Sequence, residues 1–406
     1  MSHVAFFSFP AYAHVAPTLP VAAELVRRGH RVTYAVADRF ADRVAATGAD
    51  VLRYESTFPW SSAPGAVDDP DRAMRTMLNF LAEGIAPLDT AARRFADDHP
   101  DLFVHDLASS ETARLLAKKW HRPIAQVVPT FATNKTFDMN DAQAANHTPA
   151  VVDPGHPDVQ AFVRRSRELL AAHDLSTVDI KGFGGDYGYN LVFLPKEFQI
   201  RGDTFDDRYE FIGPCFDEAA DSGAWTPPAN GLPIVLISLG TSHSAGQMEF
   251  FRTCVRAFAG QPWHVVLTLG GWVEPAELGP LPDNVEAHQF VPHPAVLRHA
   301  RVFVTHAGMG SVMESLFYEV PMVAVPAQID QKVIAGQVED LGLGRTVSRA
   351  DLTAADLRAV VGEVAVDELV RVRVARMCQH VRTAGGAVRG ADAVESWLHD
   401  PTSEVD

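Results

Sequence analysis

The sequence contains few cysteines, no cluster of positive charge and no long hydrophobic run. The cysteines Cys215, Cys254 and Cys378 are odd in number and far apart, so they predict neither a disulfide framework nor a zinc site. Lys and Arg total 35 against 51 Asp and Glu, which gives a formal net charge of −16. That charge argues against nucleic acid or an anionic membrane as the main partner, since both attract basic patches.

The longest apolar stretches also limit what the chain can be. Those around Ile234–Leu239 and Val320–Val325 fall well short of the ~20 residues that a membrane-spanning helix requires. The first residues, Met1–Val4, carry no basic segment before an apolar run, so we expect no signal peptide. Together with the sparse cysteines, these features predict a soluble protein of the reducing cytoplasm.

Strand and helix patterns alternate in two series along the 406 residues, of which 47% are hydrophobic. Apolar runs typical of buried parallel strands occur at 4–9, 31–37, 102–105, 123–128, 191–194 and 209–212, and again at 233–239, 264–269, 285–290, 302–305 and 322–325. Helical spacing occurs at 19–26, 111–120, 247–259 and 310–317, and across most of 353–398. Such alternation predicts two doubly wound α/β domains.

A segment rich in Asp, Ala, Pro and Gly separates the two series at 217–231. We therefore expect an N-terminal domain over 1–216, a linker over 217–231 and a C-terminal domain over 232–406, with a cleft between the domains. Within the first domain, 56–80 and 130–190 break the strand–helix rhythm and carry many apolar residues. These residues either pack on the sheet or line a pocket formed by long loops.

The strongest local motif is Thr305–Glu314, with the sequence THAGMGSVME. A buried strand ends there, two glycines allow a tight turn, and a helix opens near Gly310, where free N–H groups suit a phosphate. His306 and Ser311 add donors. The third glycine of the dinucleotide-binding fingerprint is absent, which argues against an NAD enzyme. The simpler alternative is a tight turn that contains a hydrogen-bonded histidine.

Other strand ends in the second half carry groups that suit a nucleotide sugar. Asp330 and Gln331 follow one strand and could hold sugar hydroxyls, although Asp330 could equally cap a helix. Phe290 and the Val291 backbone follow another strand and suit a nucleobase, unless Phe290 is simply a core residue. Ser238–Thr241 end a third strand and could meet a diphosphate from its other side.

In the first half, His14 and Asp106 each follow a predicted strand at the same edge of the sheet. A histidine that is oriented and kept basic by a carboxylate forms a general-base pair. Taken singly, His14 could be an ordinary turn residue and Asp106 a helix cap. Their joint placement favours the general-base pair.

Together, these segments resemble the family 1 glycosyltransferases of the GT-B fold, and in particular the bacterial macrolide glycosyltransferases. The matching positions are 29–32, 100–106, 211–214, 238–240, 262–266, 290–293, 306–311, Glu314, Pro321, Pro326 and 330–331. The resemblance covers nearly the whole chain and is weakest at 56–80 and 130–180. It implies two Rossmann-like domains facing across a cleft, and it allows the last helix, about 386–400, to pack back on the first domain.

The resemblance implies a role for each matched residue. His14 would deprotonate the acceptor hydroxyl, and Asp106 would orient His14. The nucleotide sugar would be held by Ser238, Thr241, Phe290, Val291, His293, His306, Gly308, Gly310, Ser311, Glu314, Asp330 and Gln331. The expected acceptor contacts are Trp60, Met77, Phe80, Phe131, Phe137 and Met139. Two positions depart from the family pattern: Ala13 replaces a usual Gly before the catalytic His, and His293 replaces a usual Gln.

The implied reaction is inverting O-glycosyl transfer of a hexose to a hydroxyl of a lipophilic natural product such as a macrolide. UDP-glucose is the preferred donor and a dTDP-deoxysugar the second choice. No metal or other cofactor is implied, because the carboxylate pair Asp69-Pro70-Asp71 follows no strand and lies in an acidic loop. The acceptor, the oligomeric state (a homodimer included), and a role in biosynthesis or in antibiotic self-resistance stay open.

Two alternative functions fit the same fold. A nucleotide-sugar epimerase or hydrolase would not need a large apolar acceptor pocket. A catalytically inactive partner of another glycosyltransferase would not need an intact His14 and Asp106, so the presence of both residues argues against it.

Overall fold

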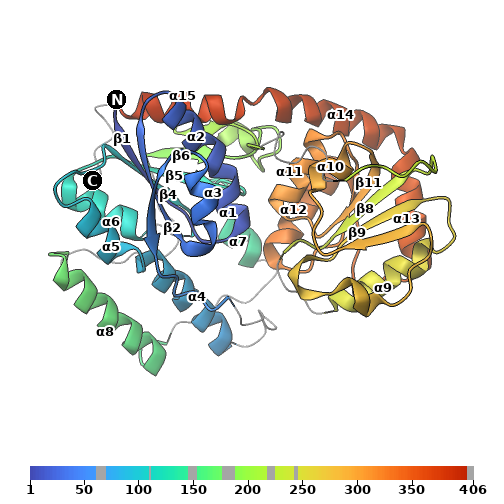
Figure 1. The fold of residues 1–406 in the computed structure, drawn as a ribbon, viewed down its shortest axis with the longest axis horizontal. Helices are drawn as coiled ribbons and strands as arrows, with labels where there is room; N and C mark the ends of the chain where they lie inside the picture. Colours follow the sequence, from blue (N-terminus) through green and yellow to red (C-terminus); the bar gives the residue numbers. More distant parts are fainter. Residues whose placement is uncertain are drawn as a thin grey trace.

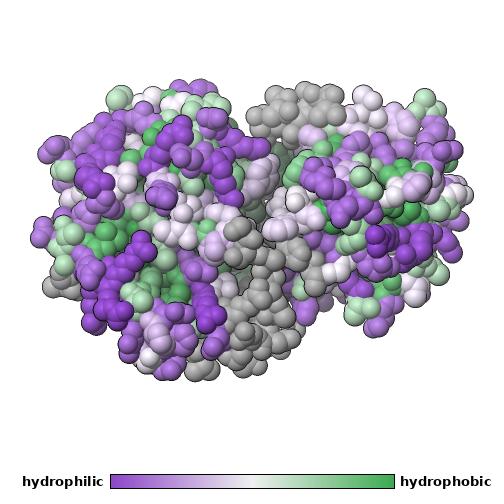
Figure 2. Space-filling model, turned by 60° about the horizontal axis from the view of Figure 1, so that its bottom comes forward, coloured by the Kyte–Doolittle hydropathy of each residue, from purple (hydrophilic) through white to green (hydrophobic). Residues whose placement is uncertain are grey.

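The computed structural model shows two parallel β-sheets, each covered by helices (Figure 1). We call the sheet of β1–β7 with its helices the first half, and the sheet of β8–β13 with its helices the second half. The structure describes residues 1–60, 70–108, 111–144, 153–175, 188–216, 225–241 and 246–399. In Figure 2 the two halves lie side by side, and a hollow is visible between them. Among the described residues, no helix combines the length and the hydrophobicity needed to cross a bilayer.

The first sheet has seven parallel strands in the order β3-β2-β1-β4-β5-β6-β7. The strands are β1 (His3–Phe7), β2 (Arg31–Ala37), β3 (Asp50–Tyr54), β4 (Leu102–Asp106), β5 (Ile124–Val128), β6 (Tyr189–Val192) and β7 (Tyr209–Phe211). Strands β1, β4 and β5 are buried along their whole length, which explains their nearly continuous apolar sequences. The strand order reverses between β1 and β4, and ligands of α/β proteins bind at such a switch point.

The helices of the first half include several in stretches that the sequence suggested as loops. They are α1 (Tyr12–Val15), α2 (Leu19–Arg27), α3 (Ala41–Ala45), α4 (Pro70–Ile85), α5 (Leu88–Arg94), α6 (Glu111–Trp120), α7 (Met139–Ala144) and α8 (Pro157–Ala172). Of the two alternatives for 56–80 and 130–190, a pocket formed by long loops is therefore wrong where α4, α7 and α8 lie. Helix α4 forms because Met74, Leu78, Leu81 and Ile85 recur at helical spacing and are buried.

The second sheet has six parallel strands in the order β10-β9-β8-β11-β12-β13. The strands are β8 (Ile234–Ser238), β9 (His264–Thr268), β10 (Val285–His288), β11 (Ala300–Thr305), β12 (Met322–Ala324) and β13 (Gly344–Thr346). The helices are α9 (Gln247–Phe258), α10 (His293–Leu297), α11 (Met309–Phe317), α12 (Ile329–Asp340), α13 (Ala354–Val366), α14 (Glu368–Thr383) and α15 (Gly386–Trp397). Its switch point lies between β8 and β11.

Contacts between the halves include a shared core and the packing of the last described helix. The shared core includes Phe131 and Met139 of the first half and Ile334 and Val338 of α12. Helix α14 runs along the second half, and α15 continues onto the first, where it packs against α2 (Figure 1). The predicted linker, 217–231, lies partly outside the described residues, so the domain boundaries stay a prediction.

Candidate active site

The two predicted catalytic residues meet at the switch point of the first sheet. His14 lies on the short helix α1 directly after β1, and Asp106 is the last residue of the neighbouring strand β4. The Nδ1 atom of His14 lies 2.9 Å from both carboxylate oxygens of Asp106. Asp106 is fully buried and also accepts a hydrogen bond from the Ala108 N–H. Because Nδ1–H donates to the carboxylate, Nε2 is the nitrogen available to accept a proton.

The surroundings of His14 favour its protonated form. Burial alone would lower the pKa of the imidazole, but the charge of Asp106, its hydrogen bond and the charge of Asp330 outweigh burial. The pKa of His14 is therefore raised above its usual 6.5. The side chain still has 26% of its surface exposed, which leaves it accessible to a substrate.

Asp330 brings the second half of the molecule to the same place. It lies in the first turn of α12, where burial raises the pKa of its carboxyl group and backbone N–H groups and His14 act in the opposite direction. The N-cap of α12 is Gln328, so Asp330 is not the cap. The Oε1 atom of Gln331 accepts from the N–H groups of Ala327 and Gln328, so that oxygen already stabilises the turn.

The predicted diphosphate site lies at the carboxyl end of β11. A Cβ atom added to Gly240 would lie 2.6 Å from His306 Cε1, and one added to Gly308 would collide with Nε2, so both glycines make room for the ring. Ser238 is buried, and its Oγ accepts from the Gly240 N–H, whereas Thr241 is exposed. Burial lowers the pKa of His306 to about 4, with His293 and Arg349 adding to the effect, so the ring is neutral at neutral pH.

The first turn of α11 is open to a ligand. The helix begins at Met309 with Gly308 as its N-cap, and Gly310 and Ser311 lie in its first turn. A Cβ atom added to Gly310 would meet nothing within 4 Å. Ala307 has a φ of 62°, a left-handed conformation that turns the chain from β11 into the helix. Free N–H groups in this turn, beside a neutral histidine, form an arrangement that suits a phosphate.

Phe290 lies near the carboxyl end of β10, and 64% of its surface is exposed. Such an exposed ring is free to stack on a nucleobase, whereas Val291 is buried.

The sequence reasoning did not single out Trp272, which lies near the same strand ends. It is 42% exposed and donates from Nε1 to the Thr241 carbonyl at 3.1 Å. Gly271 lies next to Phe290, since a Cβ atom there would be 4.0 Å from its Cζ.

The predicted base and ribose contacts are joined by a hydrogen bond. His293 Nδ1 lies 2.9 Å from Glu314 Oε2, and both side chains are mostly buried. His293 begins α10, whereas Glu314 lies one turn into α11. The histidine that departs from the family pattern therefore fixes the carboxylate predicted to hold the ribose.

Four aromatic rings, Phe9, Phe58, Trp60 and Phe80, form an aromatic cluster beside His14. Phe9 is the centre: its ring centroid lies 5.4 Å from that of His14, 5.1 Å from Phe58, 5.6 Å from Trp60 and 5.0 Å from Phe80. Trp60 and Phe80 were predicted as acceptor contacts, whereas Phe9 and Phe58 were not. Contacts between distant segments build this cluster, so no local pattern could have identified it.

Within the part of the chain that the structure describes, the other predicted acceptor residues form no ring contact with the aromatic cluster: Met77 lies one turn from it, and the rest belong to a different core. Met77 is partly buried on α4, three residues before Phe80. Phe131 and Met139 are only 1% and 6% exposed and belong to the core shared by the two halves, with Phe137 packed against them. In this structure they have a packing role, and their contact with an acceptor stays a prediction.

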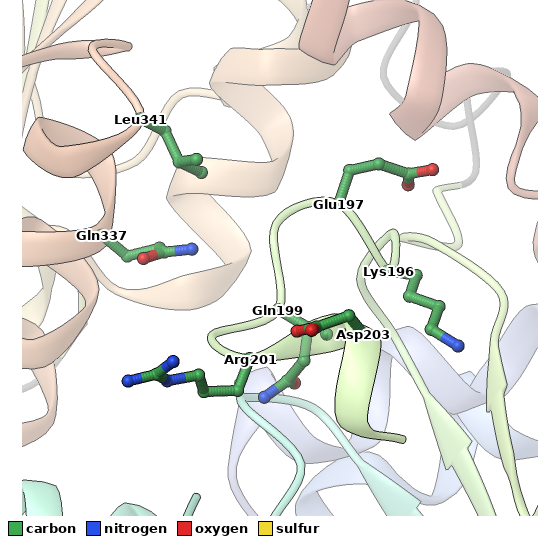
Figure 3. A pocket seen from close by; sticks show the side chains of 8 residues that line it. Lys196, Glu197, Gln199, Arg201, Asp203, Gln337 and Leu341 are labelled. Atoms are coloured by element: carbon green, nitrogen blue, oxygen red, sulfur yellow. The ribbon is translucent and has the colours of Figure 1, made fainter. Parts of the chain in front are cut away.

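An open cavity of about 490 Å³ lies between α12 and the segment that follows β6 (Figure 3). Gln337 of α12 and Leu341, just after that helix, line it from the second half. The first half lines it with Lys196, Glu197, Gln199, Arg201, Gly202 and Asp203. Gln337 Nε2 donates to the Phe198 carbonyl at 2.9 Å and so joins the halves. The cavity contains none of the predicted site residues, so it is a feature of the junction between the halves.

Comparisons with known proteins point to one family. Residues 223–381 match the family model described as "UDP-glucoronosyl and UDP-glucosyl transferase". The oleandomycin glycosyltransferase of Streptomyces antibioticus is 39% identical, covering 98% of this chain and 91% of that protein. The demethyllactenocin mycarosyltransferase of Streptomyces fradiae is 35% identical, covering 98% and 87%. The crystal structure of the calicheamicin glycosyltransferase CalG4 has 36% identity and a TM-score of 0.82, covering 98% of each chain.

Proposed function

Because the chain belongs to the family 1 glycosyltransferases, which have the GT-B fold, we propose that it transfers a hexose from a nucleotide sugar to a hydroxyl of a lipophilic natural product, with inversion. The observation that carries this proposal is the hydrogen-bonded pair of accessible His14 and buried Asp106, with Asp330 of the other half acting on the same histidine. A base in one half thus faces a candidate sugar-binding carboxylate in the other.

The proposed chemistry is one displacement at the anomeric carbon. Nε2 of His14 takes the proton of the acceptor hydroxyl while the hydroxyl oxygen attacks that carbon. The bond from the anomeric carbon to the diphosphate oxygen breaks, and its electron pair leaves with the nucleoside diphosphate. Asp106 stabilises the imidazolium that forms. A single displacement inverts the centre, so an α-linked donor gives a β-glycoside.

Negative charge grows on the departing diphosphate, and the start of α11 is arranged to receive it. The free N–H groups of the first turn, the Ser311 hydroxyl and neutral His306 are fixed donors at this place. Each well-placed donor of this kind contributes roughly 3 kcal/mol to the stabilisation of a developing anion. No metal or other cofactor takes part in this mechanism.

Donor and acceptor are proposed from the geometry and the relatives together. The Asp330 carboxylate and the Gln331 amide suit the hydroxyls of glucose, so UDP-glucose is the first donor to test and a dTDP-deoxysugar the second. Phe290 would stack on the base, and Glu314, held by His293, would bind the ribose. Similarity to an oleandomycin glycosyltransferase supports a macrolide acceptor, in biosynthesis or in self-resistance.

The aromatic cluster favours a transferase over the alternatives. An epimerase or hydrolase of nucleotide sugars has no need for four aromatic rings next to its base, because it binds no lipophilic acceptor. An inactive partner has no need for the hydrogen-bonded His14–Asp106 pair. Both alternatives nevertheless predict distinct products or none, so one experiment separates them.

The test is a matrix of UDP- and dTDP-sugars against macrolide and other lipophilic acceptors, with glycosides detected by mass spectrometry. We expect product with the wild type and a loss of about 10³-fold in kcat for His14→Ala, as befits removal of a general base. His99→Ala, at a half-buried histidine that stacks on Trp120, is the matched control and should retain wild-type activity. Donor conversion without any glycoside would support the epimerase or hydrolase instead.

A further inference from the structure

Glu83 is a fully buried carboxylate on α4 that the proposed reaction does not use. Its Oε1 accepts from the Tyr54 hydroxyl at 2.9 Å. Its Oε2 accepts three hydrogen bonds, from Thr57 N at 2.7 Å, Thr57 Oγ1 at 3.1 Å and Phe58 N at 2.9 Å. Four hydrogen bonds offset the cost of burying the charge and hold the carboxylate in one position.

These hydrogen bonds determine where the chain goes after β3. The strand ends at Tyr54, and the next residues leave the sheet and run toward α4. Because one carboxylate oxygen binds the N–H groups of two consecutive residues, the backbone at Thr57 and Phe58 has a single orientation. Phe80 lies on α4 one turn before Glu83, and the Phe58 ring packs against it at 5.1 Å. Glu83 thus positions Phe58 within the aromatic cluster.

The aromatic cluster connects Phe58 to the proposed catalytic base through ring contacts. Phe58 packs edge-on against Phe9 at 5.1 Å, and Phe9 packs edge-on against the His14 ring at 5.4 Å. Asp106 fixes His14 only at Nδ1, so rotation of the imidazole about that bond is limited by the ring that packs against it. A shift of Phe58 would therefore change the place of Nε2 relative to the acceptor hydroxyl.

The far side of the aromatic cluster is closed by Arg39. Its guanidinium lies 3.5 Å from the centre of the Trp60 ring, and it donates to the carbonyl of Pro10, two residues before the start of α1, the helix that carries His14. Burial lowers the pKa of Arg39, and the negative charge of Glu83 counteracts that effect. Trp60 also donates from Nε1 to Ser56 Oγ. Both edges of the 56–60 segment are thus held, one by Glu83 and the other by Arg39.

We propose that Glu83 is a positioning residue that fixes the aromatic cluster against His14 and so aligns the acceptor hydroxyl with the base. The inference rests on the proposed glycosyl transfer. It assigns Glu83 no contact with either substrate: its effect passes through Phe58 and Phe9. The donor site, in the other half, should not depend on it.

The test compares Glu83→Ala with Glu83→Gln. The amide of Gln can place its oxygen at the three-bond position, so Glu83→Gln keeps the hydrogen bonds to Thr57 and Phe58. Its N–H can donate to the Tyr54 hydroxyl, which reverses that bond, and the charge is lost. Glu83→Ala removes all four hydrogen bonds. We expect Glu83→Ala to lower kcat/KM for the acceptor by about 10-fold to 100-fold, as for other small misplacements in active sites, with the KM for the donor unchanged. Glu83→Gln should restore the wild-type value.

Tyr54→Phe is the matched control for stability. It leaves one oxygen of the same buried carboxylate without its partner, but keeps the three hydrogen bonds to Thr57 and Phe58. We expect a lower melting temperature with unchanged acceptor kcat/KM. If Glu83→Ala lowers only the melting temperature, or raises the KM of donor and acceptor alike, Glu83 is merely structural and the proposal is wrong.

If Glu83→Ala does not fold, Phe58→Leu tests the proposal in its place. It leaves the carboxylate and its hydrogen bonds in place and removes the ring that links them to Phe9. The same selective loss in acceptor kcat/KM supports the proposal, and a wild-type value overturns it. The wild-type assay separates the two levels of inference: no transfer by the wild type overturns the proposed function and this inference together, whereas transfer that is insensitive to these variants overturns only the role of Glu83.

Discussion

Each half of the molecule places one predicted site histidine near the switch point of its sheet, yet the two histidines are opposites. His14 follows β1 and has a pKa above its usual 6.5, whereas His306 follows β11 and has a pKa near 4. Burial lowers both values. Only His14 has a carboxylate at 2.9 Å, and its charge reverses the direction of the shift. The partner, not the fold position, decides which histidine accepts a proton.

Because of this difference, the two halves stabilise opposite charges in the proposed reaction. The first half stabilises a positive charge that appears on the base, and Asp106 lies buried beneath it for that purpose. The second half receives a negative charge on the leaving group, with His306 kept neutral between Gly240 and Gly308. A neutral ring can donate a hydrogen bond to a diphosphate without taking up a proton. The comparison leads to three predictions, from the largest expected effect to the smallest.

Asp106→Asn should make His14 resemble His306. Without the carboxylate, burial dominates, so the pKa of His14 falls and kcat drops by about 10²-fold to 10³-fold. In the wild type, His14 must be neutral to act, so kcat/KM rises with pH through a value above 6.5. This rise is the acidic limb of the pH profile, and in Asp106→Asn it moves to lower pH. A pH profile of kcat/KM for the acceptor measures both effects.

The matched control is Asp38→Asn, at an exposed carboxylate paired with Arg53. It should leave the rate and the profile unchanged. An acidic limb that stays in place in Asp106→Asn, or a limb below 6.5 in the wild type, would contradict the assignment of His14 as a base coupled to Asp106.

His306→Ala tests the other side of the comparison. Loss of one fixed donor at the leaving group should lower kcat by about 10²-fold. Because His306 is already neutral at the pH of the reaction, the acidic limb should keep its position, in contrast to Asp106→Asn. Parallel pH profiles of this variant and the wild type are the decisive measurement. A displaced limb would mean that His306 titrates during turnover.

Phe290→Ala should have the smallest effect and should act on binding alone. Loss of a stacking partner for the base is expected to raise the donor KM by about 10-fold, since such stacking contributes roughly 1–3 kcal/mol. The kcat value should stay near that of the wild type, because the ring lies away from the reacting atoms. Leu369→Ala, at an exposed apolar residue on α14, is the control. An unchanged donor KM would remove Phe290 from the proposed site.

Local patterns were sufficient for much of the fold. The ranges 31–37 and 111–120 match β2 and α6 residue for residue, because a buried strand and an amphipathic helix each leave a periodic pattern. The meeting of His14 and Asp106 also followed from sequence, since both were expected at carboxyl ends of strands in one parallel sheet. Strand β3 and the short strand β13 were not predicted.

What the sequence could not supply depends on contacts between distant segments or on competition for one group. The aromatic cluster joins residues 9, 58, 60 and 80, which share no periodicity. Helix α4 has helical spacing, but its proline- and aspartate-rich start resembles a loop. Gln331 was predicted to hold sugar hydroxyls, yet its side-chain oxygen accepts hydrogen bonds from the backbone N–H groups of Ala327 and Gln328. A residue type alone does not reveal whether its side chain binds a ligand or the protein's own backbone.

The position of α15 has a consequence for how the chain is made. Ala391, Val394 and Trp397 fill the core around β1 and α2, Trp397 stacks on Tyr189 at 5.0 Å, and Arg28 binds Glu395. The ribosome makes α15 after every strand of both sheets. The half that is synthesised first therefore leaves the ribosome with an open apolar face and cannot complete its core until the whole second half has followed. Domains usually fold in the order in which they emerge; here the first to emerge is completed last.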